Sequence, residues 1–178
     1  MKRILLVIGG GIAAYKSLEL IRTLKRAGIG ARCILTSAGK QFVTPMSVSA
    51  LSGEKVYDDL FSLTDEAEMG HIELSRSADL VVVCPATADL MAKAAHGICD
   101  DLATTALLAT DTPVMMAPAM NVRMWQHPAT QANLETLKSR GVTIIDPEEG
   151  EMACGEFGPG RLADPELIAG RIADALGS

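Results

Sequence analysis

Hydrophobic positions along the chain form short unbroken runs, separated by longer stretches in which they recur every three or four residues. The first run, residues 4–8, contains five consecutive apolar side chains and ends in glycines. Such a run is typical of a strand buried on both faces of a parallel sheet. The same reasoning predicts further strands at residues 31–36, 77–84, 113–117 and 142–145.

The stretches between these strands have the period of amphipathic helices. Leu18, Ile21 and Leu24 share one face of a helix that Gly28 is expected to end. Alternating strands and helices predict an α/β fold with a parallel sheet and helices on both faces, a single Rossmann-like or flavodoxin-like domain over residues 1–178. Further helices are predicted at residues 90–95, 102–109, 129–140 and 164–176.

Composition and charge narrow the functional class. Hydrophobic residues make up 48% of the chain and charged residues 21%, as in a folded globular domain. The net charge of -6, with no basic stripe, argues against nucleic acid as a partner. No apolar run has the length of a membrane span, and no signal-peptide cleavage site follows the first run, so a cytoplasmic protein with no membrane partner is predicted.

The four cysteines stand at positions 33, 84, 99 and 154, and they form neither a CxxC pair nor a zinc-like cluster with histidine. A metal site is therefore not expected. Cys33 and Cys84 lie in predicted strands and are expected to be core residues, as free cysteines commonly are.

In a parallel α/β sheet, ligands bind beyond the carboxyl ends of the strands. The segments that follow each predicted strand are therefore the candidate regions for chemistry. They are residues 9–14, 36–39, 85–89 and 118–121 and the loop after Ile145.

The first of these segments has the spacing GxGxxA, at Gly9, Gly11 and Ala14, between a strand and a helix. It predicts either a nucleotide site, with an anion at the helix N-terminus, or a turn that serves packing alone. A dinucleotide site would need an acidic residue about 20 positions further on. Thr36 and Ser37 end the second strand instead, which favours the phosphate of a mononucleotide over the ribose of NAD.

Three polar side chains allow two interpretations each. Thr87 and Asn121 can each cap the helix that follows or bind a ligand, since an amide provides two donors and an acceptor. His71 opens a short helical stretch and is either a surface residue or an acid–base group with a suitable pKa. His96 and His127 have no special context and are expected to be structural.

Residues 153–161 form the most unusual segment, with Cys154 among three glycines and a proline between the last strand and the last helix. This composition predicts a mobile lid that carries a thiol rather than a core segment. Arg161, at the end of the lid, is suited to holding a phosphate or a carboxylate.

Together these segments resemble the flavin-dependent cysteine decarboxylases, and within that family the enzymes that act on phosphopantothenoylcysteine. The resemblance runs from the first strand to the last helix, and its six motifs occur in the family's order, which makes it specific. The lid cysteine separates this family from the related flavin prenyltransferases. The matching motifs are residues 10–16, 71–74, 85–89, 97–102, 118–121 and 153–158.

The resemblance implies bound FMN and decarboxylation of N-phosphopantothenoyl-L-cysteine to 4′-phosphopantetheine and CO2 in coenzyme A biosynthesis. By analogy, His71 would be the acid–base residue, Asn121 would hold the substrate carboxylate and Cys154 would donate the proton of the last step. The substrate site would comprise Met120, Asn121, Ala153 and Arg161. The flavin site would be lined by Gly10, Gly11, Ile12, Thr36, Ser37, Thr87, Ala88, Asp89 and Ala119.

The chemistry that the family implies is consistent with these roles. Loss of CO2 from an amino-acid carboxyl leaves an unstabilised carbanion. A thioaldehyde, formed when the flavin oxidises the cysteinyl thiol, accepts those electrons as an enethiolate. Reduced flavin then returns a hydride and a thiol supplies the proton, so no net redox change results.

The resemblance also implies a homo-oligomer, a trimer or a dodecamer of trimers, with the flavin site between subunits. In most bacteria the decarboxylase is fused to a synthetase, so a fused or separate synthetase is an expected partner. The chain has Asp89-Leu90 where many relatives have Asn-Thr, and an anionic side chain there would alter the hydrogen bonding of the flavin. Cys99, in place of a usual alanine, is expected to be a packing change.

Two other functions stay open on the sequence. A decarboxylase of the C-terminal cysteine of a peptide would use the same chemistry on a larger substrate. A non-catalytic flavoprotein subunit that regulates a partner would keep the FMN residues but lose His71 or Cys154, and both are present. An NAD dehydrogenase is disfavoured because the ribose-binding acid is missing.

Overall fold

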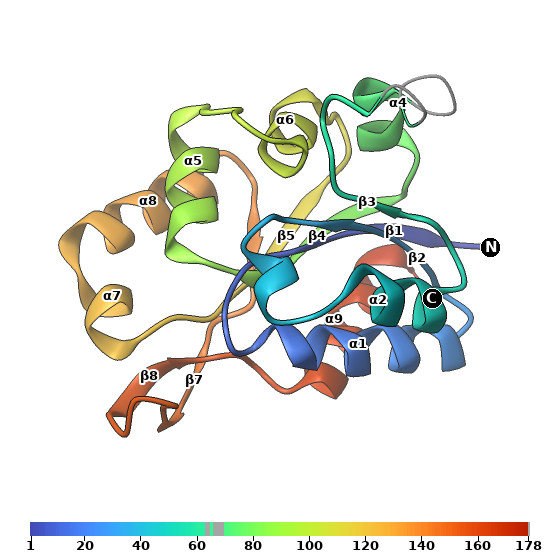
Figure 1. Ribbon diagram of the computed structural model, residues 1–178. Helices are drawn as coiled ribbons and strands as arrows, with labels where there is room; N and C mark the ends of the chain where they lie inside the picture. The colour runs from blue at the N-terminus through green and yellow to red at the C-terminus, as the bar shows by residue number, and fades with distance from the viewer. Residues whose placement is uncertain (63–64, 66–69, 178) are drawn as a thin grey trace.

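The computed structural model describes residues 1–62, 65 and 70–177, and its centre is a parallel sheet (Figure 1). The strands are β1 (Arg3–Ile8), β2 (Gly30–Leu35), β3 (Val56–Tyr57), β4 (Leu80–Ala86), β5 (Val114–Pro118) and β6 (Thr143–Ile144). They are ordered β3-β2-β1-β4-β5-β6, and every neighbouring pair is parallel. This is the Rossmann order rather than the flavodoxin order, and the strand order reverses between β1 and β4.

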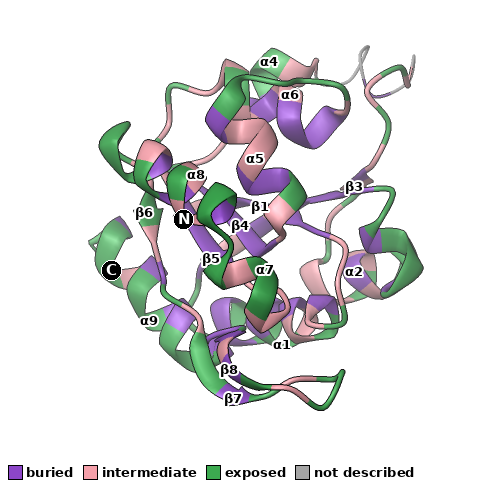
Figure 2. Ribbon diagram, turned by 90° about the vertical axis from the view of Figure 1, so that its left-hand side faces the viewer, coloured by how far each residue is buried: buried purple, intermediate pink, exposed green. Residues whose placement is uncertain are grey.

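Helices cover both faces of this sheet. They are α1 (Ala14–Arg26), α2 (Pro45–Ser52), α4 (His71–Arg76), α5 (Ala88–His96), α6 (Leu102–Ala109), α7 (Val122–Gln126), α8 (Pro128–Ser139) and α9 (Pro165–Leu176), with a 3-10 turn η1 (Gly39–Gln41). Leu6 and Val82 belong to a core shared with α1, α2 and α9, whereas Leu5 and Val81 belong to a core shared with α4, α5, α6 and α8. Alternate residues of a strand point to opposite faces, so the central strands are buried between two helical layers (Figure 2). The predicted α/β architecture is confirmed.

The local signals for helix ends are also confirmed. Asp164 is the N-cap of α9, because its Oδ1 accepts a hydrogen bond from the Glu166 N–H at 2.8 Å. Pro128 is the first residue of α8. Gly28 and Gly141 follow helices and have positive φ angles of 75° and 87°, which glycine adopts without strain.

Other elements carry no clear hydrophobic signal and were not predicted. These are the short helices α2 and α7 and the short strand β3. Strand β6 was predicted, but it is shorter than the predicted residues 142–145. The largest difference lies in the segment expected to be a lid, which forms an antiparallel hairpin of β7 (Glu148–Glu151) and β8 (Phe157–Arg161). Backbone hydrogen bonds hold the two strands together. Such bonds do not require alternating apolar and polar residues, so the sequence of this segment does not predict a hairpin.

Candidate active site

A cavity of about 1050 Å³ opens at the carboxyl ends of β1, β2, β4 and β5, and the turn of the β7–β8 hairpin also lines it. It lies where the strand order reverses, as expected for an open α/β sheet. Cys154 is part of its wall, as are all the residues predicted for the cofactor and the substrate. These are Gly10, Gly11, Ile12, Thr36, Ser37, Thr87, Ala88, Asp89, Ala119, Met120, Asn121, Ala153 and Arg161.

His71, the predicted acid–base residue, does not line this cavity. It is the partly buried first residue of α4, a helix that packs against α6. Figure 1 shows α4 and α6 far from the β7–β8 hairpin, at the opposite side of the molecule. One copy of the chain therefore does not bring His71 and Cys154 into the same cavity.

The glycine turn after β1 is closely surrounded by the neighbouring turns. A Cβ at Gly9 would collide with the carbonyl oxygen of Pro85, and a Cβ at Gly10 would collide with Ala38. At Gly11, by contrast, no atom of the described chain lies within 4 Å of where a Cβ would stand. Gly9 and Gly10 thus serve packing, whereas Gly11 faces the open space of the cavity. Of the two interpretations of the GxGxxA spacing, the packing turn therefore applies to Gly9 and the nucleotide site to Gly11.

Helix α1 begins at the cavity without a side-chain cap. Ala13 is its N-cap residue and makes no side-chain cap, although the N–H groups of Ala14 and Lys16 donate to the carbonyl oxygens of Gly11 at 2.9 Å and Ala13 at 3.0 Å. Thr44, Thr87 and Asp101, by contrast, cap α2, α5 and α6 through side-chain oxygens. Uncapped N–H groups at the positive end of a helix suit an anion such as a phosphate. Lys16 lines the same cavity and adds a positive charge.

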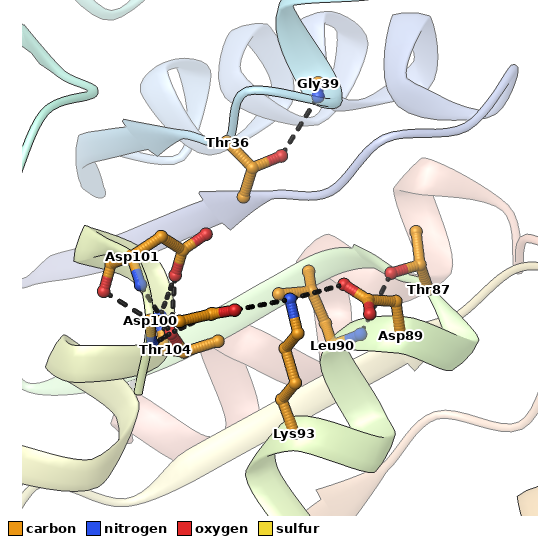
Figure 3. A network of polar contacts seen from close by, with 9 residues as sticks. All are labelled: Thr36, Gly39, Thr87, Asp89, Leu90, Lys93, Asp100, Asp101 and Thr104. Carbon is orange, nitrogen blue, oxygen red and sulfur yellow. Dashed lines mark hydrogen bonds and ion pairs between the residues drawn. The ribbon is translucent and has the colours of Figure 1, made fainter. Parts of the chain in front are cut away.

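Thr36 lines the cavity, but its hydroxyl already has partners within the protein. It donates to the carbonyl oxygen of Ile8 at 3.0 Å. It also accepts from the N–H of Gly39 at 3.0 Å (Figure 3). The residue is only 8% exposed. The hydroxyl therefore ties the turns after β1 and β2 together, whereas Ser37 beside it is exposed to the cavity.

The turn between β4 and α5 combines a helix cap with a cavity wall. Thr87 Oγ1 accepts a hydrogen bond from the Leu90 N–H at 3.2 Å, so Thr87 caps α5 as well as lining the cavity. Asp89 is exposed in the first turn of α5 and pairs with Lys93, whose Nζ lies 3.2 Å from its Oδ2 (Figure 3). Asp89 thus has a cation one helical turn away.

Asn121 likewise has two roles. Its Oδ1 accepts hydrogen bonds from the N–H groups of Arg123 at 2.8 Å and Met124 at 3.3 Å, which caps α7. Its Nδ2 donates to Glu156 Oε2 at 2.8 Å and to Cys154 Sγ at 3.7 Å. Because the cap occupies Oδ1, the N–H donors of the amide face the hairpin, where Glu156 accepts the shorter hydrogen bond and Cys154 Sγ the longer one. Donors of this kind suit a carboxylate.

The β7–β8 hairpin, which carries Cys154 in its turn, is docked beside α7. The backbone N–H of Met120 donates to the carbonyl oxygen of Gly160 at 2.9 Å. Gly160 has a φ of 136°, and a Cβ there would collide with the carbonyl oxygen of Met120, so only glycine permits this approach. Arg123 Nε, 3.4 Å from Glu156 Oε1, adds an ion pair between α7 and the hairpin.

The cysteines fall into two classes. Cys33 and Cys84 are buried in the sheet, as predicted, and desolvation raises the pKa of each thiol to about 12. Cys99 and Cys154 are exposed. The packing role expected of Cys99 therefore does not hold, because the loop between α5 and α6 lies on the surface.

Sequence reasoning missed several residues of the site, and three of them carry charge. Lys16 and Lys93 line the cavity, and Glu156 holds Asn121 from outside it. The signal for Lys93 is its spacing of four from Asp89 on a predicted helix. No comparable signal pairs Glu156 with an asparagine 35 positions earlier.

Neither a metal centre nor a membrane segment is found in the part of the chain that the structure describes. Its His, Cys, Asp and Glu side chains form no group of three or more that could hold a metal ion. None of its helices is both long and apolar enough to cross a bilayer.

Comparison with known proteins identifies the family. The family model described as Flavoprotein matches residues 1–177. The coenzyme A biosynthesis bifunctional protein CoaBC of Escherichia coli (strain K12) is 52% identical over 167 residues, which cover 94% of this chain and 41% of that protein. The chain thus spans about two fifths of the length of the curated relatives it matches.

Two solved structures share the fold over nearly their whole length. A cysteine-to-serine mutant of PPC decarboxylase, in complex with pantothenoylaminoethenethiol, has a TM-score of 0.86 at 32% identity, with 99% of both chains covered. The FMN-dependent cysteine decarboxylase SpaF has a TM-score of 0.83 at 32% identity, with 99% of this chain and 98% of that chain covered. Since the family model matches all but the last residue and the Escherichia coli relative is more than half identical, the chain belongs to the flavoprotein family.

Proposed function

We propose that this protein uses bound FMN to decarboxylate N-phosphopantothenoyl-L-cysteine to 4′-phosphopantetheine and CO2 in coenzyme A biosynthesis. The observation that carries the proposal is the meeting of Asn121 and Cys154 in one cavity, where an amide suited to a carboxylate lies beside an exposed thiol. Similarity to the bifunctional CoaBC proteins supports the pathway, and likeness to the PPC decarboxylase structure supports the reaction.

The residues around the glycine turn fit FMN. The uncapped start of α1, the open space at Gly11 and the exposed Ser37 would hold the phosphate. Ala88 and Ala119 have small side chains that leave room for a flat ring. When bound, FMN supplies the reversible two-electron oxidation of the substrate thiol. The proposed cofactor site comprises Gly10, Gly11, Ile12, Thr36, Ser37, Thr87, Ala88, Asp89 and Ala119.

The proposed substrate site lies at the hairpin side of the cavity. Asn121 would hold the substrate carboxylate through one amide N–H, in place of its long contact with Cys154 Sγ, while the other N–H stays with Glu156. Met120 and Ala153 are neighbouring walls. Arg161 also lines the cavity, and its guanidinium is suited to a phosphate or a carboxylate.

Cys154 would act in the second half of the reaction. Once the carbon that carries sulfur is oxidised to a thioaldehyde, the bond to the carboxylate held by Asn121 can break, because the thioaldehyde accepts the electron pair as an enethiolate. The carbon that lost CO2 then needs a proton. Cys154 is exposed and lies 3.7 Å from the amide nitrogen of Asn121, so its thiol can give that proton and recover one from solvent.

His71 is the proposed acid–base residue of the early step, which requires a second copy of the chain. It lies outside the cavity of its own chain, so a neighbouring subunit would have to supply it. A homo-oligomer built from trimers, either a trimer or a dodecamer, is the assembly we propose.

A synthetase is the proposed functional partner. The curated relatives are bifunctional, and the aligned part is 41% of the Escherichia coli protein, so these relatives have room for a second activity. A flavoprotein domain over residues 1–178 and a cytoplasmic location stay predictions.

Two measurements test the proposed function. The purified protein is expected to show a flavin absorption band, and to release CO2 from N-phosphopantothenoyl-L-cysteine. A protein without flavin absorbance after addition of FMN would overturn the proposal. A peptide with a C-terminal cysteine is the comparison substrate, and faster turnover of that peptide would establish the peptidyl-cysteine alternative in its place.

A further inference from the structure

Asp89 places a negative charge on the wall of a cavity proposed to bind an anionic cofactor. Its carboxylate lies in the first turn of α5, and 69% of the side chain is exposed in the open cavity. FMN carries a phosphate and the chain itself has a net charge of -6. An isolated carboxylate at this position would therefore oppose binding of the cofactor.

Lys93 compensates this charge from one turn further along the same helix. Its Nζ lies 3.2 Å from Asp89 Oδ2 and 3.3 Å from Asp100 Oδ2, so a single ammonium bridges two carboxylates (Figure 3). Only 25% of the Lys93 side chain is exposed. Partial desolvation by itself lowers the pKa of Lys93, but hydrogen bonds to Asp89 and Asp100 outweigh it and raise the pKa, so Lys93 stays charged.

The backbone that carries the second carboxylate is hydrogen-bonded to the start of α6. The backbone N–H of Asp100 donates to Thr104 Oγ1 at 3.1 Å. Thr104 and Asp101 form a capping box at the start of α6, in which the Thr104 N–H donates to Asp101 Oδ1 at 2.8 Å. Asp101 itself lines the cavity. The loop before α6 thus fixes Asp100, and Asp100 in turn limits where the Lys93 ammonium can lie.

We propose that Lys93 is a positioning residue for the cofactor. It holds the Asp89 carboxylate along α5 and offsets part of the charge of Asp89 and Asp100, so that Asp89 can accept a hydrogen bond from a polar N–H of the bound group with less repulsion than a bare carboxylate would exert. This inference rests on the proposed function, because it requires FMN in the cavity.

The effect of losing Lys93 is expected to depend on whether a cofactor occupies the cavity. In the open cavity Asp89 is exposed to water, and an exposed pair at this helical spacing contributes little to folding. A bound cofactor excludes water and lowers the local dielectric constant, so an uncompensated charge becomes costly. Cofactor binding and apoprotein stability should therefore respond differently to loss of Lys93.

The test compares Lys93→Gln, Lys93→Arg, Asp89→Asn and the double variant Asp89→Asn/Lys93→Gln. FMN dissociation constants are measured by flavin fluorescence, midpoint potentials by redox titration, and thermal unfolding on the FMN-free proteins. Lys93→Gln is expected to weaken FMN binding about fivefold or more and to lower the midpoint potential, because a bare carboxylate disfavours the more negatively charged reduced flavin. Its apoprotein should unfold close to the wild-type temperature.

Two control variants isolate the charge. Lys93→Arg keeps a cation and should bind FMN within about twofold of wild type. The double variant lacks the Asp89 charge as well as Lys93, so it should bind FMN more tightly than Lys93→Gln, although the Asp100 carboxylate remains.

The inference is overturned if Lys93→Gln binds FMN like wild type, or if the double variant binds as weakly as Lys93→Gln. The second result would show that Lys93 acts through the packing of α5 and not through the charge of Asp89. Both of these results assume a wild-type protein that binds FMN. A wild-type protein that fails to bind FMN overturns the proposed function together with this inference.

Discussion

The side-chain amide nitrogen of Asn121 lies 3.7 Å from the Sγ of Cys154, although 33 positions separate the two residues. The contact depends on docking of the β7–β8 hairpin beside α7, where Glu156 accepts a hydrogen bond from the same amide nitrogen at 2.8 Å. It joins a group that can hold a carboxylate to one that can donate a proton, which is the pair that decarboxylation followed by protonation requires.

Asn121→Asp separates the helix-capping role of Asn121 from its role in binding. Aspartate caps a helix as well as asparagine does, so α7 should keep its stability. The new carboxylate offers no N–H and repels the substrate carboxylate, so the KM for N-phosphopantothenoyl-L-cysteine should rise at least about tenfold, which corresponds to about 1.4 kcal/mol. Steady-state kinetics and thermal unfolding provide the two readouts.

Glu156 must be considered in that experiment, because it would face the new carboxylate. The variant Asn121→Asp/Glu156→Gln is the matched control, since a glutamine amide can donate to the aspartate and restore the contact between α7 and the hairpin. It should recover hairpin stability without recovering substrate binding. Recovery of a wild-type KM in this double variant would contradict a carboxylate-binding role for Asn121.

Cys154→Ser is expected to stop the reaction after CO2 has been lost. A serine hydroxyl is a far weaker acid than a thiol, so the last protonation should fail. The flavin band should bleach, and mass spectrometry should detect a bound product that lacks CO2 and two hydrogens relative to the substrate. Normal turnover would reduce Cys154 to a lid residue, and absence of CO2 release would assign it to the first half.

His71→Asn is expected to stop the reaction before the substrate is oxidised. The variant should bind FMN, because His71 does not line the cavity of its own chain, but it should neither oxidise nor decarboxylate the substrate. Rapid-mixing absorbance of the flavin band, with CO2 release measured in parallel, distinguishes this outcome from that of Cys154→Ser. Bleaching of the flavin by His71→Asn would contradict an early role.

Two adjacent glycines are expected to respond differently to alanine. Gly10→Ala would force a Cβ into Ala38, and such overpacking costs roughly 1–3 kcal/mol of the free energy of unfolding. Gly11→Ala meets no atom within 4 Å in the described chain, so the apoprotein should be as stable as wild type. The same methyl group would occupy cavity space and should weaken FMN binding. A Gly11→Ala protein that binds FMN normally would place the cofactor elsewhere.

Thiol labelling at about pH 8 should distinguish the two classes of cysteine. The thiolate is the reactive form, and burial raises the pKa of Cys33 and Cys84 to about 12, so both stay protonated and shielded. Cys99 and Cys154 are exposed and should react quickly with a disulfide reagent in the native protein. All four should react in denaturant. Rapid native labelling of Cys33 or Cys84 would contradict the buried positions.

Light scattering of the FMN-bound protein should give a mass that is a multiple of three chains. Exposed apolar side chains near the cavity mouth and on α4 are consistent with contacts between copies, as Ile12 is 62% exposed and Ile72 is 51% exposed. A monomer at micromolar concentration with FMN bound would contradict the proposed assembly and leave His71 without a route to the cavity.

Local chemistry accounts for the elements that could be predicted from the sequence. The run at residues 4–8 is apolar on both faces because β1 is covered by helices on both faces, and this produces a pattern visible without a structure. Asp164 and Gly28 mark helix ends through interactions with residues only a few positions away. The turns that line the cavity could be predicted because ligands bind at the carboxyl ends of the strands in a parallel α/β sheet.

The sequence by itself determined the fold class, most of the elements and the turns that line the cavity, because hydrophobic period, caps and glycine spacing act over short distances. Only the tertiary structure decided which partners those residues meet. It joined the Thr36 hydroxyl to the carbonyl oxygen of Ile8, placed His71 outside the cavity and docked the hairpin that carries Cys154 beside Asn121. These relations depend on distances between segments far apart in the chain, and such distances exist only after the sheet has assembled and its layers have packed.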